Sequence, residues 1–226
     1  MCTIATIFSI VGLIGVATDA DTLISVNWAN SEVTNVRTNG FPTDESIHFY
    51  CGLNNLVIEV EDNGVQDTTS KSWSAADCEE GKSCEAFDDC KETATATVLT
   101  AVMNVVTKIP SLVTLIKRMP RTGDNNCGKF MSIFTGFLGI ISLSVALGDF
   151  HVYCYKSLLD EDSFDIIHTN DDGVSVNLTG DPEYQLGPGF ICMCLALVFD
   201  VPALIVNILV PCPPPAVNPD EAFEGL

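Results

Sequence analysis

Positive charge is scarce in this chain of 226 residues, in which 10 Lys and Arg stand against 30 Asp and Glu and the net charge is −20. A surface of that sign repels phosphate, so we expect no nucleic-acid partner. Histidine is also rare, with three in the whole sequence, and neither a nucleophile motif nor a glycine-rich phosphate loop is present. We therefore expect a protein that is not an enzyme.

Charge of either sign is nearly missing from four stretches, residues 2–18, 93–116, 130–148 and 189–210. A helix rises 1.5 Å per residue, so about 20 residues cross a hydrocarbon core ~30 Å thick. Buried core helices could explain any one stretch, but four of them between polar loops favour membrane spans. The sequence predicts transmembrane helices at 1–18, 93–116, 130–148 and 189–211, of which the first is short.

The acidic residues concentrate in two of the connecting loops, because 19–92 has a net charge of −12 and 149–188 a net charge of −8, whereas 117–129 has +3. Short basic loops stay in the cytoplasm. We therefore expect a multi-pass protein of the plasma membrane or cell surface, with both termini, 117–129 and the tail 212–226 cytoplasmic and the acidic loops outside. A cleaved signal peptide is the alternative for 1–20, since Ala17 and Ala20 are small, but no basic segment precedes it.

Loop 19–92 has the pattern of short strands. Runs rich in β-branched and aromatic residues lie at 23–28, 32–37, 47–51 and 56–61, with turn signals at Asn39-Gly40 and Asn63-Gly64. We expect another strand at 174–178, a polar loop over 66–89 and a continuation of the third helix through 151–159. The predicted fold is a membrane all-α four-helix transmembrane bundle with a small extracellular antiparallel β-sheet.

Five cysteines lie in the two predicted outer loops, at Cys51, Cys78, Cys84, Cys90 and Cys154. Disulfides persist outside the cell. The four cysteines of the first loop allow three pairings, and the sequence does not choose among them. Cys154 is free, or pairs with the first loop or with another chain. A metal site at the clustered cysteines is the alternative, but no histidine lies near them, and we expect no metal there.

The only Asn-x-Ser/Thr sequon, Asn177-Leu178-Thr179, falls in the second predicted outer loop and predicts glycosylation at Asn177. The acidic runs 77–80, 85–89 and 160–162 could attract Ca²⁺ weakly. They lack EF-hand spacing, and a solvated, repulsive surface is the favoured interpretation. We expect no bound cofactor.

Two charged residues lie within predicted spans, Lys108 in the second and Asp200 in the fourth. Each costs roughly 2.5–3.5 kcal/mol at a helix centre, so each needs a partner or water. Lys108 precedes Lys117 by nine residues and Asp200 precedes Pro211 by eleven, which puts both at similar depth, about 13 and 16 Å from the inner boundary. We predict an ion pair inside the bundle. Alternatively, Lys108 extends towards the inner surface while Asp200 is protonated or faces a partner, or the two belong to a proton or ion pathway.

Several short motifs resemble the claudin superfamily, which includes the claudins, the peripheral myelin protein group and amastin-like proteins. The segment 183–190 resembles the one that leads claudins into their fourth helix. Cys84, followed by an aromatic residue and an acid, resembles the second cysteine of the claudin first-loop signature. The other matching positions are Trp28, Gly52, Leu53, Tyr184 and Gly187. The match departs from the family where Asn54 stands in place of the second signature tryptophan and where no cysteine follows at the usual distance.

The resemblance implies an outer β-domain pinned by a bridge between Cys51 and Cys84, which would leave Cys78 and Cys90 for a second bridge. It also implies a structural or adhesive membrane protein that makes lateral or cell-surface contacts through its acidic extracellular β-domain. The alternatives are an accessory subunit of a channel, receptor or larger assembly, and a transporter using Lys108 and Asp200. The expected partners are membrane lipid and other membrane proteins or the chain itself.

Overall fold

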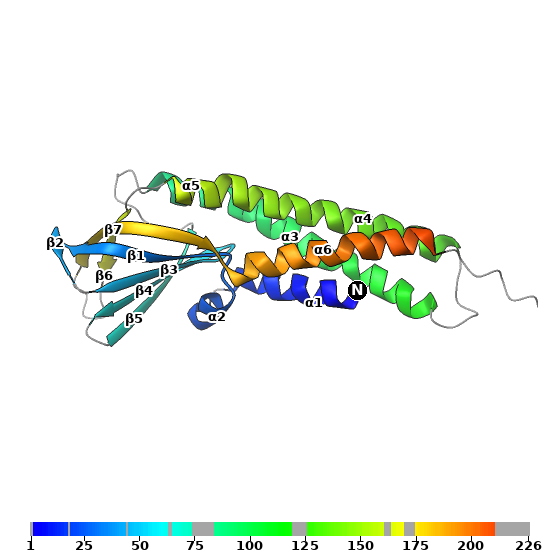
Figure 1. Cartoon of the computed structure of the whole chain (residues 1–226), viewed down its shortest axis with the longest axis horizontal. Helices are drawn as coiled ribbons and strands as arrows, with labels where there is room; N and C mark the ends of the chain where they lie inside the picture. Colours follow the sequence, from blue (N-terminus) through cyan, green and yellow to red (C-terminus); the bar gives the residue numbers. More distant parts are fainter. Residues whose placement is uncertain are drawn as a thin grey trace, which may run out of the picture.

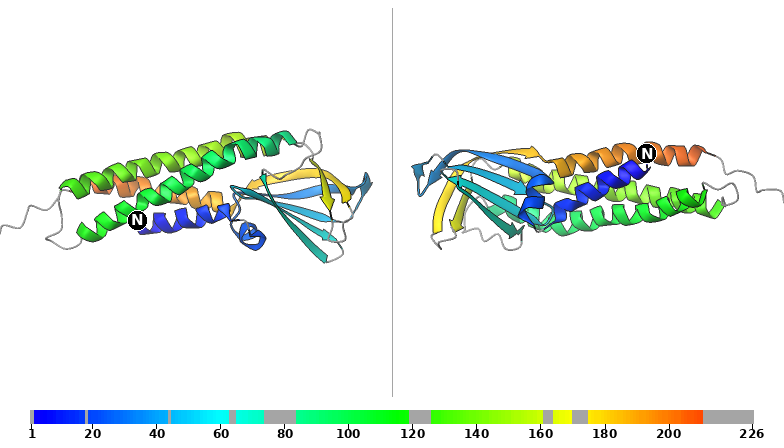
Figure 2. Two further views of the ribbon diagram at one scale, coloured as in Figure 1. Left: turned by 180° about the vertical axis from the view of Figure 1, so that it is seen from behind. Right: turned by 90° about the horizontal axis from the view of Figure 1, so that it is seen from below.

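The computed structural model describes residues 2–17, 19–43, 45–62, 65–73, 84–118, 126–160, 164–169 and 175–210. Its helices lie side by side along one axis, and one β-sheet projects from one end of them (Figure 1). We call that end of the helices the sheet end. The termini of the bundle helices at the other end lie far from the sheet (Figure 2).

Four helices form the bundle: α1 (Cys2–Leu13), α3 (Cys84–Arg118), α4 (Asn126–Asp149) and α6 (Pro188–Leu209). A 3₁₀ turn, η1 (Ile14–Val16), extends α1, and a π-helical segment, η3 (Phe150–Tyr155), followed by α5 (Lys156–Leu159), extends α4. Within the described residues, three helices are long and apolar enough to cross a membrane: α3, α4 with its extension, and α6. α1 is apolar but shorter.

The outward faces of these helices carry large apolar side chains. Val106 on α3, Phe137 on α4 and Val198 on α6 are all about half exposed. A water-soluble bundle would place such residues inside, and exposed apolar faces of this extent mark contact with lipid or protein. The apolar side chains and the helix lengths together agree with three of the four membrane spans that the sequence predicts, those of α3, α4 and α6.

The helices extend beyond the predicted spans at the sheet end. α3 begins at Cys84, whereas the second span is predicted from residue 93, because its first turns are polar and hydropathy detects only the apolar part. The predicted helical continuation through 151–159 is confirmed by η3 and α5. Most of the predicted basic loop (119–125) and the tail (212–226) lie outside the described residues.

Within the part of the chain that the structure describes, the sheet has seven strands, all antiparallel, which confirms the predicted small antiparallel sheet. The order is β5-β4-β3-β1-β7-β6, with the short β2 paired to β1. The strands are β1 (Ala29–Thr38), β2 (Phe41–Pro42), β3 (Ser46–Cys51), β4 (Asn55–Asp62), β5 (Val65–Ser72), β6 (Phe164–Thr169) and β7 (Ser175–Leu186). Because β1 pairs with both β3 and β7, the two predicted outer loops build one sheet.

Two sequence predictions in the first loop are wrong. The run 23–28 is not a strand, since α2 (Ala20–Ser25) occupies its first half and no strand begins before Ala29. Its N-cap is Asp19, whose carboxylate accepts hydrogen bonds from Thr22 N at 3.1 Å and Thr22 Oγ1 at 2.8 Å, and this local cap outweighs the β-branched composition. The run 66–89 is not all loop either, because β5 pairs with β4 along its length and α3 begins at Cys84. β5 is a polar edge strand and lacks the apolar alternation that reveals a strand.

The two faces of the sheet differ in polarity. On β3, Ile47, Phe49 and Cys51 are buried, while His48 and Tyr50 between them are partly exposed. The apolar face belongs to the same core as the first turns of α3, where the rings of Trp73 and Phe87 lie 5.7 Å apart. The other face carries exposed polar side chains such as Glu32 and Glu183, as expected for an antiparallel sheet with one side packed, although Val57 and Glu59 of β4 are buried on it.

The turn predicted at Asn39-Gly40 is confirmed. Asn39 has φ +51° and Gly40 has φ +84°, and two consecutive positive φ values are the signature of the type I′ hairpin turn. The turn joins β1 to β2 at the end of the sheet farthest from the bundle (Figure 1). Phe41, directly after it, is 76% exposed.

Trp28 forms the centre of the joint between sheet and bundle. Its side chain is completely buried, and its indole Nε1 donates a hydrogen bond to Gly12 O on α1 at 2.8 Å. Its ring packs edge-on against Phe150 at 5.0 Å and against Phe190 at 5.8 Å. One side chain between α2 and β1 therefore contacts α1, α6 and the extension of α4.

Backbone hydrogen bonds complete this joint. Trp28 N donates to Cys51 O at 2.8 Å, and Gly187 N donates to Trp28 O at 2.9 Å. Leu53 N donates to Gly15 O at 2.8 Å, which ties the β3–β4 turn to the end of α1. At Gly187 a Cβ atom would lie 1.9 Å from Asn27 Oδ1, so only glycine fits there.

We expect Trp28→Ala to destabilise the protein by roughly 3–5 kcal/mol, because it removes a large buried ring and leaves a cavity. Phe41→Ala is the matched aromatic control, and its largely exposed ring predicts almost no change. Thermal unfolding of both purified variants in detergent measures the difference. Equal midpoints for Trp28→Ala and wild type would show that the joint does not depend on this ring.

Candidate functional site

An ion pair lies inside the bundle, between Lys108 on α3 and Asp200 on α6. The Lys108 ammonium contacts the Asp200 carboxylate directly, and the side chains are only 6% and 14% exposed. This is the pair that the matching depths in the sequence predict. α3 and α6 both run away from the sheet end (Figure 1). Lys108 and Asp200 lie a similar number of residues before the far ends of these two helices, so the two charges lie at one level.

Polar side chains surround this pair along one face of α3. Asn104, Thr107, Lys108 and Ser111 recur at the spacing of one helical face and are all at least partly buried. Asn104 Nδ2 donates to Gly139 O on α4 at 2.8 Å. We call these four side chains the polar face of α3.

The polar face of α3 continues into hydrogen bonds between the other helices. The Ser111 and Thr135 hydroxyls lie 2.9 Å apart, between α3 and α4. Asn207 Nδ2 on α6 donates to Ser132 Oγ on α4 at 2.8 Å. In hydrocarbon the hydrophobic effect does not draw helices together, and hydrogen bonds between helices contribute to their specific association. These two hydrogen bonds therefore help to fix how α3, α4 and α6 pack.

A second candidate site lies on the solvent side of the sheet. The register places Glu59 opposite His48, His48 opposite Glu32 and Glu32 opposite Glu183 across four neighbouring strands. We call these four residues the acidic row. Directly opposed side chains on an antiparallel sheet share a face with Cβ atoms about 4.5–5.5 Å apart, so three carboxylates and one imidazole stand side by side.

Glu59 is the buried member of the acidic row. Tyr50 Oη donates a hydrogen bond to one of its carboxylate oxygens at 3.1 Å, and Gln66 Nε2 donates to the other at 2.5 Å. Burial, the hydrogen bond and the negative charge of Glu59 raise the pKa of Tyr50 to about 12. The Tyr50 hydroxyl therefore stays protonated and keeps donating its hydrogen bond to Glu59 at physiological pH. The other two carboxylates of the acidic row, those of Glu32 and Glu183, are exposed.

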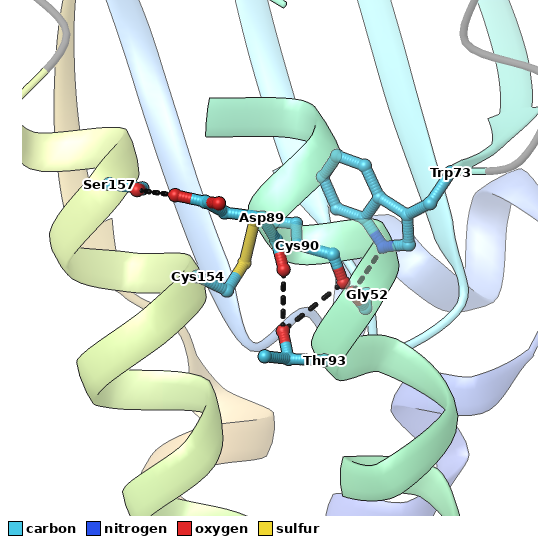
Figure 3. Close-up of a disulfide and its surroundings, with 7 residues drawn as sticks. All are labelled: Gly52, Trp73, Asp89, Cys90, Thr93, Cys154 and Ser157. Carbon is cyan, nitrogen blue, oxygen red and sulfur yellow. Dashed lines mark hydrogen bonds between the residues drawn. A yellow bond between two sulfur atoms is a disulfide. The ribbon is translucent and has the colours of Figure 1, made fainter. Parts of the chain in front are cut away.

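A disulfide joins Cys90 on α3 to Cys154 on η3 at the sheet end of the bundle (Figure 3). Next to it, Ser157 on α5 donates a hydrogen bond to the Asp89 carboxylate. Thr93 Oγ1 donates to Asp89 O at 2.9 Å, within α3. The bridge connects residues 64 positions apart and ties the first predicted outer loop to the second.

This bridge corrects the pairing that the family resemblance implies. Cys78–Cys90 is wrong, because Cys90 is bonded to Cys154. Cys51–Cys84 is wrong as well, because Cys51 is a free thiol buried at the end of β3. The physical reason is that Cys90 lies within the first two turns of α3, beside η3, and not in a loop beside the sheet. Burial raises the pKa of the Cys51 thiol to about 12, and Cys78 lies outside the described residues.

The motif residues taken from the resemblance gather near the joint of sheet and bundle. Gly52 has no room for a side chain, since a Cβ would lie 2.3 Å from Leu23 Cδ2, and Leu53 beside it is buried. Tyr184 is buried on β7, and its carbonyl accepts a hydrogen bond from Tyr155 Oη at 3.3 Å. With Trp28 and Gly187 these positions hold the sheet on the helices, which is a structural role.

Two predicted sites keep the status of predictions. Asn177 lies on β7 opposite Ile167 of β6, and its glycosylation stays a prediction. For the weak Ca²⁺ site, two of the three acidic runs lie wholly or partly outside the described residues. Among the residues that are described, no group of three or more His, Cys, Asp or Glu side chains is placed to hold a metal ion.

Comparison with known proteins gives no relative: neither a protein-family profile nor a curated protein matches this chain. The claudin resemblance therefore stays an expectation based on the residues quoted above, and function has to be argued from the sites themselves.

We expect Asp200→Asn to cost about 3–5 kcal/mol of stability, because it leaves the Lys108 ammonium buried without its counter-charge. Lys108→Met should cost a similar amount. The double change Lys108→Leu with Asp200→Leu should recover most of the loss, since it replaces a buried pair by apolar groups. Thermal midpoints of the three variants test this, and additive losses in the double variant would contradict the pairing.

We expect peptide mapping without reduction to recover Cys90 and Cys154 in one linked peptide. Cys154→Ser should lower stability by about 2–4 kcal/mol, the typical contribution of a disulfide. Cys192→Ser, which changes a free cysteine on α6, is the control and should have little effect. Recovery of Cys90 linked to a different cysteine would contradict the structure.

Proposed function

We propose that this chain is a four-pass, claudin-like structural or adhesive protein of the cell surface, which makes contacts through its acidic extracellular β-domain. In this proposal α1 is the fourth span, although with η1 it covers only about 22 Å by helical rise. The basic segment 117–129 and both termini lie in the cytoplasm, and the sheet lies outside, as the charge asymmetry of the loops favours.

The observation that carries the proposal is a single sheet built from both loops and held rigidly on the bundle. β1 of the first loop pairs with β7 of the second, and the Cys90–Cys154 bridge ties the loops again at the sheet end. A rigid platform at a fixed height above the membrane suits a protein that positions contacts between molecules.

The solvent-facing side of the sheet supports the choice of contact surface. Glu32 and Glu183 are exposed in the acidic row, with Asp181 also exposed on β7 and Glu61 on β4. Surfaces of one sign repel copies of themselves and attract the opposite sign. Contacts through this side are therefore expected with basic surfaces, and contacts between two copies are expected through other parts of the β-domain.

Neutralising the acidic row tests the proposal. We expect Glu32→Gln with Glu183→Gln to reduce proximity cross-linking of the protein to its neighbours on the cell surface, and moderate salt to have the same effect on wild type. Asp21→Asn with Glu92→Gln removes two exposed carboxylates away from the sheet strands and is the matched control. Equal cross-linking by all three proteins would reject the acidic row as the contact surface.

Two further measurements separate this proposal from the alternative functions. Recovery of one larger membrane protein in stoichiometric amount, independent of the acidic row, would favour the accessory-subunit function. Ion or proton flux in liposomes that is lost in Asp200→Asn but not in Glu32→Gln would favour transport.

A further inference from the structure

Three polar atoms in the core of the bundle have no hydrogen-bond partner among the described protein atoms. They are Ser9 Oγ on α1, and Thr97 Oγ1 and Asn104 Oδ1 on α3. The exposed fraction of each residue is 1% or less. Within a membrane, an unmatched polar group costs several kcal/mol, so partners for these atoms are expected.

Ser9 and Asn104 lie at the same depth in the bundle. Gly12 packs against Met193, since a Cβ at Gly12 would lie 2.4 Å from Met193 Cγ, and this fixes the level of α1 against α6. Ser9 lies three residues farther from the sheet end than Gly12, about 4.5 Å by helical rise.

The level of α3 against α6 follows from the ion pair. Asp200 lies seven residues beyond Met193, and its partner Lys108 lies four residues beyond Asn104. Asn104 is therefore about 4.5 Å farther from the sheet end than Met193, the same level that Ser9 has. α1 and α3 are in contact, so the two unmatched groups lie on neighbouring helices at one height.

The chemistry of the two groups selects their ligand. The Asn104 amide oxygen only accepts hydrogen bonds, while the Ser9 hydroxyl donates and accepts. The Asn104 amide nitrogen is already used by Gly139 O, which fixes the orientation of the amide. A cation is disfavoured, because the Lys108 ammonium lies one turn away on the same face of α3. A molecule that donates to both groups, carries no charge and fits between helices is water.

We propose that the bundle binds water at a site between Ser9, Asn104 and the Lys108–Asp200 pair. The bound water donates to Asn104 Oδ1 and hydrogen-bonds Ser9 Oγ. It also lies within a helical turn of the ammonium, which has more donors than its single carboxylate partner uses. Thr97, two turns nearer the sheet end on α3, extends the same line of polar groups. This property of the bundle is independent of the contact function proposed for the sheet.

Removing the Ser9 hydroxyl gives a test in which the sign of the effect decides. If water is bound, Ser9→Ala deletes one of its partners and lowers the thermal midpoint of the full chain in lipid nanodiscs by about 2–4 °C. If the site is dry, the same change removes an unmatched buried hydroxyl and raises the midpoint.

Thr100→Val is the matched control, because the Thr100 hydroxyl donates to Ala96 O on its own helix at 2.9 Å and needs no water. A midpoint that stays the same or rises in Ser9→Ala overturns the proposal.

A direct measurement covers the case in which a variant folds poorly. X-ray radiolysis produces hydroxyl radicals from bound water, which oxidise methionines beside it. The buried Met193 should be oxidised faster than the lipid-facing Met103 in the wild type, and this difference should shrink in Ser9→Ala. Equal oxidation of the two methionines in the wild type overturns the proposal.

Discussion

The structure depends on the packing of Trp28 at the point where a water-exposed sheet meets an apolar bundle. The two parts obey opposite rules, because the sheet buries one face and hydrates the other while the bundle exposes apolar side chains in every direction. At the joint the backbone leaves one regime for the other, and its polar groups must be satisfied without bulk water. The indole bond to Gly12 O and the backbone bonds of Trp28 and Leu53 meet this need. Glycines at the points of closest approach make room for them.

Polarity inside the bundle follows from the same requirement. Away from water, a lysine is tolerated only where a carboxylate meets it, and Lys108 meets Asp200. The hydroxyls and amides around the pair make hydrogen bonds between α3 and α4 and between α4 and α6. These directional bonds specify the relative positions of the helices more narrowly than apolar contacts alone. Acidic residues without a lysine partner, among them Glu32 and Glu183, lie on the sheet, where water solvates them. The segregation of charge that is visible in the sequence therefore separates the part of the chain that water solvates from the part whose surroundings are apolar.

The sequence was most informative where one physical signal dominated. Hydropathy located the apolar helices, and the similar depths of Lys108 and Asp200 in their predicted spans predicted the ion pair between them. It failed where local or distant interactions decided. The capping carboxylate of Asp19 turned an apparent strand into α2, and the polar edge strand β5 had no alternation to detect. The family resemblance implied bridges within the first loop, whereas the structure has one of the alternatives that the sequence left open for Cys154, a bridge to the first loop. The choice depends on how far α3 extends beyond its apolar part, which hydropathy does not report. The acidic row arises from strand register, so no local pattern could reveal it.

The order of strands has a consequence for biosynthesis. β1 lies within the sheet, yet its neighbour β7 is separated from it by more than a hundred residues and by two of the bundle helices, α3 and α4. During translation the ribosome delivers β1 to β5 first, so a half-sheet with an open β1 edge exists until α3 and α4 have been inserted and the second loop has emerged. Open edges pair with any available strand. We therefore expect the open edge of β1 to be the part of the nascent sheet most exposed to mispairing, and slow insertion of α4 would lengthen that interval.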